Sequence, residues 1–288
     1  RKGMALESVK TLMHMADGRK TSVLAFICLD YNMAVSVIRA AEREDRPAII
    51  MLLPEHVTAY QVSGFKPFAA MVKALAEDVN VPIGLHLDHS YSEEEIYQAI
   101  DAGFDSVMFD ASNESLERNI MRTKNIVSYA HSRGVSVEAE LGSVGVAING
   151  DNEKQNFFTD PDMAAFFCER TGVDALAVAI GNAHGDYPYP PRLDLERLDE
   201  INRKTETPLV LHGGSGIPDT QLSEAFARGI NKFNYGTDIL RCYDQAIRQY
   251  HQNRQMPKSL DILGVPGCVQ KAMTEVVRKK MQLCRIVI

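Results

Sequence analysis

The heptapeptide IGLHLDH, residues 83–89, begins as an apolar segment and ends in two polar side chains. Short apolar segments rich in Val, Ile, Leu and Ala recur along the whole chain, separated by longer amphipathic segments typical of helices. Strands that are apolar almost throughout are typical of a parallel sheet covered on both faces. The heptapeptide is therefore interpreted as one strand of a parallel α/β fold.

Eight such strands are predicted, at residues 22–28, 48–53, 83–88, 105–109, 136–140, 175–180, 209–211 and 232–234. Helices are predicted at residues 33–44, 65–77, 93–102, 115–132, 161–170, 194–204 and 219–227. Eight strand–helix units favour a closed (β/α)8 TIM barrel over an open doubly wound sheet. Because no linker rich in Pro, Gly or Ser divides the chain, residues 1–288 are interpreted as a single domain. Additional C-terminal helices, at 237–251 and 268–283, could serve oligomerisation or wrap around the barrel.

Composition excludes several classes of protein. The hydrophobic fraction of 45% and the charged fraction of 24% are typical of globular proteins and exclude a disordered chain. A net charge of -7 argues against nucleic acid and membrane surfaces as partners. No apolar run approaches the roughly 20 residues of a spanning helix, and the N-terminus lacks a signal peptide, so we expect a cytoplasmic protein. The five cysteines form no Cys-x-x-Cys pair and are interpreted as reduced thiols without a chemical role.

Histidines follow three of the predicted strands. In TIM barrels the active site lies at the carboxyl ends of the strands, where His89, His184 and His212 are expected. Three neutral imidazoles with an open fourth position are typical of catalytic zinc, although three unrelated hydrogen-bonded histidines are the alternative. Four further histidines, in helical or loop contexts, are interpreted as solvated or packing residues: His14, His56, His131 and His251.

Carboxylates accompany these histidines. Asp88 is a candidate general acid/base because it lies beside a predicted metal ligand, and its alternative role is that of a buried ion-pair partner. Asp110 and Glu140 are predicted to bind a second cation or to form hydrogen bonds to the ligands. His86 alternates with Asp88 along the strand, so it is expected to point into the barrel with it, where it either orients its neighbours or packs in the core.

Small residues follow the last two strands. Gly213, Gly214 and Ser215 come after the seventh, and Gly236 and Thr237 come after the eighth. Phosphate sites in TIM barrels are frequently formed by these two loops, where backbone N–H groups are accessible to an anion. The two loops together predict a phosphate site.

Five blocks of sequence resemble the class II, zinc-dependent fructose/tagatose-bisphosphate aldolases: LHLDH at 85–89, VEAELG at 137–142, AVAIGNAHG at 177–185, LHGGSG at 211–216 and NYGTD at 234–238. These blocks occur in order over nearly the whole chain. The chain therefore resembles a divergent member of this family. The resemblance implies a carbon–carbon lyase that acts in carbohydrate metabolism. It also implies assembly into a homodimer or homotetramer. Its reaction would be the reversible retro-aldol cleavage of a ketose 1-phosphate or ketose 1,6-bisphosphate into dihydroxyacetone phosphate and an aldehyde.

The resemblance also implies roles for individual residues. His89, His184 and His212 would bind Zn²⁺, which polarises the C2 carbonyl, while Asp88 would take the proton from the C4 hydroxyl. Asp110 and Glu140 match acidic residues near a secondary metal position. The C1 phosphate and the dihydroxyacetone moiety would be held by Gly185, Gly213, Ser215, Asn234 and Thr237.

The chain departs from the family pattern around the rest of the pocket. Ile27 replaces an asparagine, Leu53 and Pro54 stand where a serine is frequent, and a lysine is absent from HGDYPYP at 184–190. We expect an altered, more apolar pocket on the aldehyde side. We hypothesise that the aldehyde product of cleavage is not glyceraldehyde 3-phosphate and that it can lack a phosphate group.

The loop after Glu140 also differs from the family pattern. It is shorter than in the family pattern, and Ala147 and Ile148 lie near the position of an acidic residue that transfers a proton in the family. Glu153 is a candidate substitute for that residue.

Three alternatives remain open from the sequence. A tagatose- or fructose-bisphosphate aldolase proper is the first, and a catalytically altered, sugar-phosphate-binding pseudoenzyme is the second. Retention of Asp88 disfavours the pseudoenzyme, because binding alone needs no proton relay. A Schiff-base aldolase would need a lysine at the carboxyl end of a strand, whereas Lys232 is predicted to begin the eighth strand.

Overall fold

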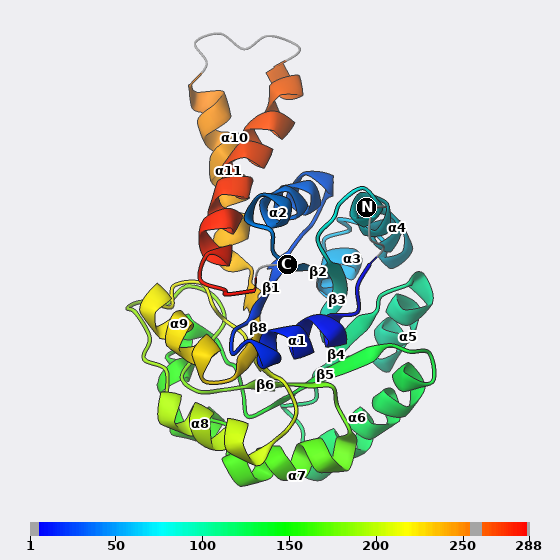
Figure 1. Cartoon of the computed structure of the whole chain (residues 1–288), viewed down its shortest axis with the longest axis vertical. Helices are drawn as coiled ribbons and strands as arrows, with labels where there is room; N and C mark the ends of the chain where they lie inside the picture. Colours follow the sequence, from blue (N-terminus) through cyan, green and yellow to red (C-terminus); the bar gives the residue numbers. More distant parts are fainter. Residues whose placement is uncertain (1–5, 254–260, 287–288) are drawn as a thin grey trace.

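The computed structural model describes residues 6–253 and 261–286. Parallel strands close into a barrel in which each strand pairs with the next and the last pairs with the first (Figure 1). They are β1 (Val23–Ile27), β2 (Ala48–Leu52), β3 (Ile83–Ser90), β4 (Ser106–Phe109), β5 (Ser136–Leu141), β6 (Ala175–Val178), β7 (Leu209–Leu211) and β8 (Ile230–Tyr235). The predicted TIM barrel is confirmed. Residues 1–5, 254–260 and 287–288 of the predicted single domain lie outside the described residues.

Helices surround the barrel because their apolar faces pack against the outward side chains of the strands. They are α2 (Tyr31–Glu44), α3 (Pro54–Thr58), α4 (Phe65–Glu77), α5 (Glu93–Ala102), α6 (Leu116–His131), α7 (Pro161–Thr171), α8 (Leu195–Lys204) and α9 (Asp219–Ala227). All are near their predicted bounds except the short α3, which the sequence did not predict.

The expectation of unpaired thiols is also confirmed for Cys28, Cys168, Cys242, Cys268 and Cys284.

The eighth strand is longer than predicted. It begins at Ile230, so Lys232 lies within the strand, and the predicted start at Lys232 is wrong. Asn231 and Lys232 interrupt the apolar pattern, yet both are buried and the strand pairs with β1 and β7 through this region. Burial of these polar residues depends on partners from distant parts of the chain, which a local pattern does not reveal.

A helix that the sequence did not predict, α1 (Val9–Gly18), covers the amino end of the barrel. Its Val9 and Leu12 pack so closely on β3 that a Cβ on Gly84 would lie 2.8 Å from Val9 Cγ2. Apolar side chains of the strands fill the barrel above α1, as is typical of TIM barrels. This cluster consists of Val9, Leu12, Met13, Ala16, Val23, Ala25, Ile49, Met51, Met108, Ala175, Ala177, Val210 and Ile286.

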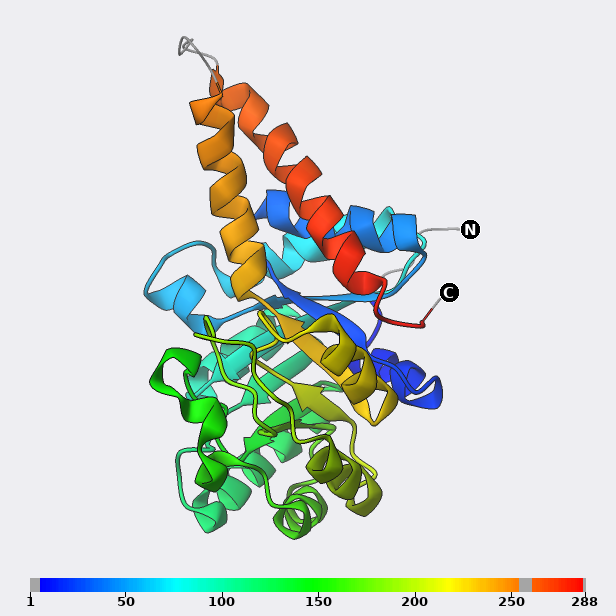
Figure 2. The ribbon, with the colours of Figure 1, turned by 90° about the vertical axis from the view of Figure 1, so that its left-hand side faces the viewer.

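The C-terminal helices α10 (Thr237–Gln252) and α11 (Val265–Met281) form an antiparallel pair that projects beyond the barrel (Figures 1 and 2). The lower part of α11 packs against α2, so this part wraps the barrel. A short 3-10 turn, η4 (Asp261–Gly264), precedes α11 and exposes Ile262 and Leu263 by 69% and 72%. Among the described helices, none is both long and apolar enough to cross a membrane.

Candidate active site

An irregularity in β3 brings two adjacent side chains into the mouth of the barrel. The pairing of β3 with β4 shifts between Leu87 and Ser90, and His89 has a φ of +36°, in the left-handed region. In a regular strand, Asp88 and His89 would point to opposite faces. A bulge of this kind re-aims a side chain beside a functional site, and here both residues contact groups inside the barrel.

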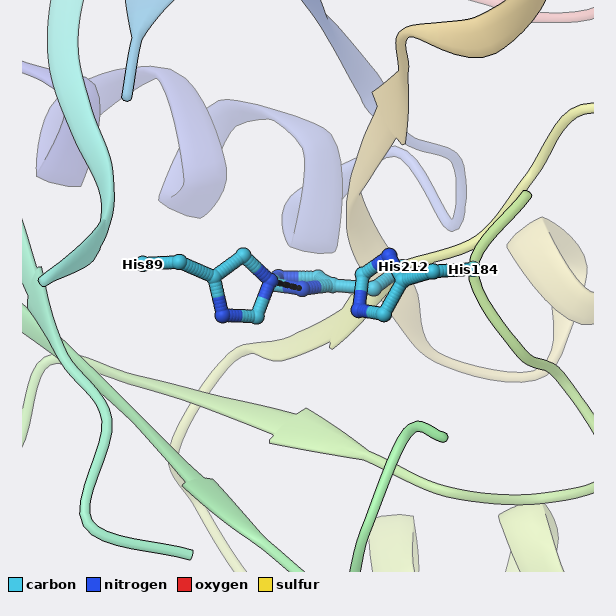
Figure 3. A group of neighbouring side chains, drawn as sticks. All are labelled: His89, His184 and His212. Carbon is cyan, nitrogen blue, oxygen red and sulfur yellow. Dashed lines mark hydrogen bonds between the residues drawn. The ribbon is translucent and has the colours of Figure 1, made fainter. Parts of the chain in front are cut away.

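Three imidazoles meet at this end of the barrel (Figure 3). His89 comes from β3, His184 from the loop after β6, and His212 directly follows β7. One ring nitrogen of each lies within 4.8 Å of the others, and the ring centroids of His89 lie 4.9 Å from His184 and 4.7 Å from His212. The structure thus brings together the three histidines that the sequence singled out.

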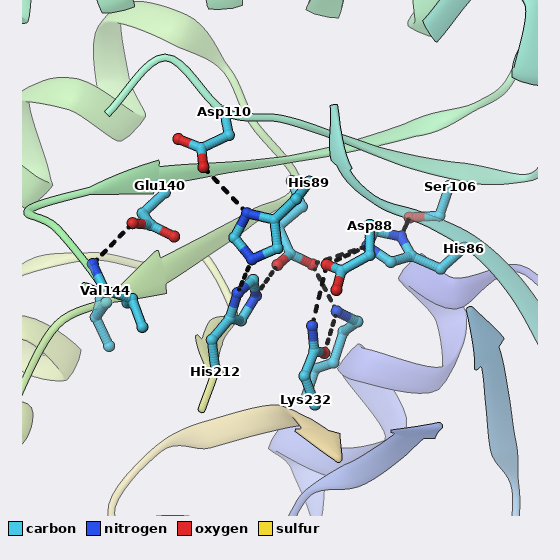
Figure 4. A network of polar contacts seen from close by, with 12 residues as sticks. His86, Asp88, His89, Ser106, Asp110, Glu140, Val144, His212 and Lys232 are labelled. Carbon is cyan, nitrogen blue, oxygen red and sulfur yellow. Dashed lines mark hydrogen bonds and ion pairs between the residues drawn. The ribbon is translucent and has the colours of Figure 1, made fainter. Parts of the chain in front are cut away.

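Carboxylates fix the orientation of two of these rings. His89 Nδ1 lies 3.0 Å from Asp110 Oδ2, and His212 Nε2 lies 2.8 Å from Glu138 Oε1, so each of these nitrogens donates a hydrogen bond (Figure 4). The remaining nitrogens, His89 Nε2 and His212 Nδ1, face one another at 2.8 Å. Metal-binding histidines characteristically donate their second N–H to a carboxylate, which directs the other lone pair at the metal. The donor set therefore fits a divalent cation.

The loop after β5 holds the third histidine. Ala147 N–H donates to His184 O at 2.9 Å and His184 N–H donates to Gly145 O at 2.7 Å, which forms a short parallel bridge. Asp151 supports this loop by accepting a hydrogen bond from Val146 N–H at 2.7 Å. A segment without a predicted element thus fixes the backbone of a candidate ligand.

Negative charge gathers around His89. Burial opposes a positive charge on this ring, but Asp88 and a hydrogen bond to Asp110 raise its pKa to about 10. The same carboxylates would favour a divalent cation at this point. Burial, with the nearby His89 and His212, instead lowers the pKa of His184 to about 3, which leaves that ring neutral and able to ligate.

Glu140 has one oxygen without a partner. Its Oε1 accepts a hydrogen bond from Val144 N–H at 2.9 Å, while the buried Oε2 has none. Burial, with the nearby Asp110, raises the pKa of Glu140 to about 8. Glu140, Asp110 and His89 also lie close enough to form a second group of possible ligands. A cation or a proton would satisfy the unpaired oxygen.

Asp88 is buried beside the histidines and accepts a hydrogen bond from Asn234 Nδ2 at 3.1 Å. Burial alone would raise its pKa, but His89 and His212 lower it, so the carboxylate form is favoured. The prediction that His86 points into the barrel is confirmed. Its Nδ1 lies 2.8 Å from Ser106 Oγ, and burial lowers its pKa to about 3.

Sequence reasoning missed two residues beneath the histidines, Glu138 and Lys232. Lys232 is fully buried, and its Nζ donates to Glu138 Oε2 at 2.9 Å and to Asn234 Oδ1 at 2.7 Å. The available signal was a charged residue in the interior of each strand, among residues expected to be buried. Because the Lys232 ammonium is fully buried and held by these acceptors, its surroundings disfavour a Schiff base.

The predicted phosphate residues lie around the same end of the barrel. Gly213 and Gly214 are required by packing, because a Cβ on either would lie 2.1 Å from Ala183 O or the Phe233 ring. Of the seven predicted residues, Thr237 lines the cavity with the histidines. Phosphate binding by Gly213, Gly214 and Thr237 stays a prediction. The same holds for the remaining four residues, Gly185, Ser215, Asn234 and Gly236.

The structure also shows what surrounds the positions at which the chain departs from the pattern described above. A Cβ on Gly236 would lie 2.4 Å from Ile27 Cδ1, so Ile27 fills the space beside a predicted phosphate loop. Ala147 is buried, whereas Ile148 is 76% exposed. Glu153 lines a different cavity, where its Oε1 accepts a hydrogen bond from Tyr189 at 2.7 Å, and its proton-transfer role stays a prediction.

A cavity of about 520 Å³ opens beside His89 and His184. Among its described lining residues there is no lysine or arginine, whereas four are acidic. The lining consists of Leu53, Pro54, Glu55, Thr58, His89, Tyr91, Glu95, Asp110, Ser112, Asn113, Glu140, Ser143, Val144, His184 and Thr237.

The fold and this site together define a TIM-barrel enzyme of the metal-dependent type. The family model described as "Fructose-bisphosphate aldolase class-II" matches residues 7–287. The chain therefore belongs to the class II fructose-bisphosphate aldolase family, whose members are metal-dependent, and it is a carbon–carbon lyase.

Similar proteins agree with this assignment. A fructose-bisphosphate aldolase of Geobacillus stearothermophilus is 40% identical over 248 residues, 85% of this chain and 86% of that protein. A 6-phospho-5-dehydro-2-deoxy-D-gluconate aldolase of Halalkalibacterium halodurans is 38% identical over 97% of this chain and 96% of its own length. The crystal structure of the YdjI aldolase from Escherichia coli K12 is 34% identical, covers 98% of both chains and has a TM-score of 0.86.

Removal of a candidate ligand tests the metal site. We expect His184→Ala and His212→Ala to lose most of the bound zinc, because each removes one of three converging imidazoles. Zinc content of the purified proteins, measured by plasma mass spectrometry, gives the result. His131→Ala, which alters a partly exposed histidine paired with Asp174, is the control and should keep its zinc. Full zinc content in all variants would contradict the site.

Proposed function

We propose that the chain binds Zn²⁺ through His89, His184 and His212 and cleaves a ketose phosphate reversibly into dihydroxyacetone phosphate and an aldehyde. The observation that carries the proposal is the position of the Asp88 carboxylate, buried beside three converging imidazoles at the mouth of the barrel. Asp110 and Glu140, with His89, are proposed to hold a second cation.

The residues divide the reaction between them. A zinc ion bound by the three histidines supplies Lewis-acid polarisation of the substrate carbonyl. Asp88, kept as a carboxylate, accepts the proton of the C4 hydroxyl as the carbon–carbon bond breaks and returns it in the reverse direction. Asn234 orients Asp88 through its hydrogen bond. Thr237, with the glycine loops after β7 and β8, is proposed to hold the C1 phosphate.

The walls of the cavity suggest the preferred substrate. Glu55 and Glu95 line it, Leu53 stands where a serine is frequent in the family, and no lysine or arginine is found among the described lining residues. A second phosphate at the aldehyde end would be repelled there. The names of similar proteins include one substrate with two phosphates and one with a single phosphate, which supports variation at this end. We infer that ketose 1-phosphates without a terminal phosphate are preferred.

The projecting helix pair supports assembly into a homodimer or homotetramer. Ile262 and Leu263 are exposed in η4, next to the outer ends of α10 and α11, where no other described element covers them. Burial of such side chains against a second copy is favourable. A symmetric contact of these tips is the proposed arrangement.

Release of dihydroxyacetone phosphate tests the reaction. We expect purified enzyme to release it from a ketose 1-phosphate and to lose this activity on chelation. Asp88→Asn should lower kcat about 10²- to 10⁴-fold, because it removes the proton acceptor. Asp244→Asn, at an exposed position of α10, is the matched control. Activity that survives complete metal removal would exclude the metal mechanism, and zinc-bound protein inactive on every ketose phosphate would favour the pseudoenzyme.

Substrate preference is tested with paired substrates. We expect a higher kcat/KM for ketose 1-phosphates than for the matching 1,6-bisphosphates. Glu95→Gln should raise kcat/KM for the bisphosphate about tenfold by removing a repulsive charge, with little change for the monophosphate. Glu94→Gln, which alters the exposed neighbour outside the cavity, should change neither. Equal rates on both substrate classes would contradict the preference.

Light scattering coupled to size exclusion tests the assembly. We expect a homodimer or homotetramer, and Ile262→Asp with Leu263→Asp should weaken it, because two charges would be buried in the contact. The exposed and distant Met121→Asp serves as the control. A wild-type protein that is monomeric at all concentrations would refute the proposed assembly.

A further inference from the structure

A continuous chain of buried polar contacts joins the candidate base to a candidate metal ligand, and Lys232 lies at its centre (Figure 4). In one direction, Lys232 Nζ donates to Asn234 Oδ1 at 2.7 Å and Asn234 Nδ2 donates to Asp88 Oδ1 at 3.1 Å. In the other direction, Lys232 donates to Glu138 Oε2, and Glu138 Oε1 accepts from His212 Nε2 at 2.8 Å.

The direction of the hydrogen bonds toward Asp88 depends on the ammonium group. An ammonium can only donate, so the oxygen of the Asn234 amide must face Lys232. The amide nitrogen is then turned toward Asp88, where it donates to the carboxylate. Without Lys232, the amide could rotate and place its oxygen against Asp88, where two acceptors would repel.

The same reasoning applies on the side of the metal. Lys232 Nζ lies 2.9 Å from Glu138 Oε2 and neutralises this carboxylate, which is buried and would otherwise be an unpaired charge. The Glu138 carboxylate then accepts a hydrogen bond from the Nε2–H group of His212. This fixes the tautomer in which the Nδ1 lone pair faces His89 and the predicted metal.

No other described cation can take this position. His86 Nε2 lies 3.8 Å from Asp88 Oδ1 and 3.6 Å from Glu138 Oε2, beyond hydrogen-bond distance, and its lowered pKa leaves the ring neutral. Lys232 has no exposed side-chain surface, and its ammonium group is held by Glu138 and Asn234, so it acts through these neighbours.

We propose that Lys232 is a positioning residue. It makes Asn234 present its N–H group to Asp88, and through Glu138 it keeps the proton of His212 on Nε2. The part that concerns Asp88 rests on the proposed aldolase reaction, whereas the part that concerns His212 rests only on metal binding. One buried ammonium thereby couples the orientation of the proton acceptor to the orientation of a metal ligand.

A double-mutant cycle tests the action on Asp88. We expect Lys232→Met to lower kcat about 10- to 100-fold with a smaller change in KM. If Lys232 acts on Asp88 through the amide, Lys232→Met combined with Asn234→Ala should have the same kcat as Asn234→Ala alone when both are measured at saturating zinc. Losses that simply add would overturn this part, because a lysine that only stabilises the barrel would not depend on Asn234.

Zinc affinity tests the action on His212. We expect Lys232→Met to weaken zinc binding about 10- to 100-fold in competition with a chromophoric chelator. An unchanged dissociation constant would overturn this part. If the wild type cleaves no ketose phosphate, the proposed reaction fails, and this measurement still decides whether Lys232 positions His212.

Two further variants separate positioning from folding. Where Lys232→Met does not fold because Glu138 is left unpaired, Lys232→Met with Glu138→Gln removes both charges, and the comparisons are made against Glu138→Gln alone. Lys10→Met removes a lysine bonded to Asp174 at 2.8 Å at the amino end of the barrel. This control should keep both kcat and zinc affinity, and a matching loss in it would overturn the proposal.

Discussion

The ion pair between Lys232 and Glu138 is the interaction on which the interior of the barrel depends. Removing two charges from water is costly, and their attraction compensates only when the remaining polar atoms are also satisfied. Here Asn234, Asp88 and His212 complete the set of partners. These polar residues form a layer above the apolar cluster that α1 covers, so the barrel is closed and apolar at one end and charged at the other.

Separate segments of the chain supply this layer, and the barrel brings them together. Lys232 and Glu138 lie within their strands, whereas Asp88, Asn234 and His212 lie at or near the carboxyl ends, where parallel strands share one rim. The bulge at Asp88 and His89 adds a second side chain from β3. The loop after β5 contributes backbone hydrogen bonds that hold His184. The strands thus supply side chains of the site, whereas the loop after β5 holds the backbone of His184.

The two ends of the substrate would meet different surroundings. The candidate metal ligands, Asp88 and the glycine loops resemble the family pattern, whereas the cavity wall combines Leu53 with Glu55 and Glu95. Ile27 packs beside Gly236 in the loop after β8.

The sequence alone determined the barrel, the family and the three histidines with Asp88, because apolar periodicity and the residues at strand ends are local properties. It missed α1, began β8 too late at Lys232 and gave no role to Glu138 or Lys232. Only the tertiary structure decided these points. A charged residue within an apolar strand can be interpreted only when its partners, here from β5 and β8, are known to lie within hydrogen-bond distance.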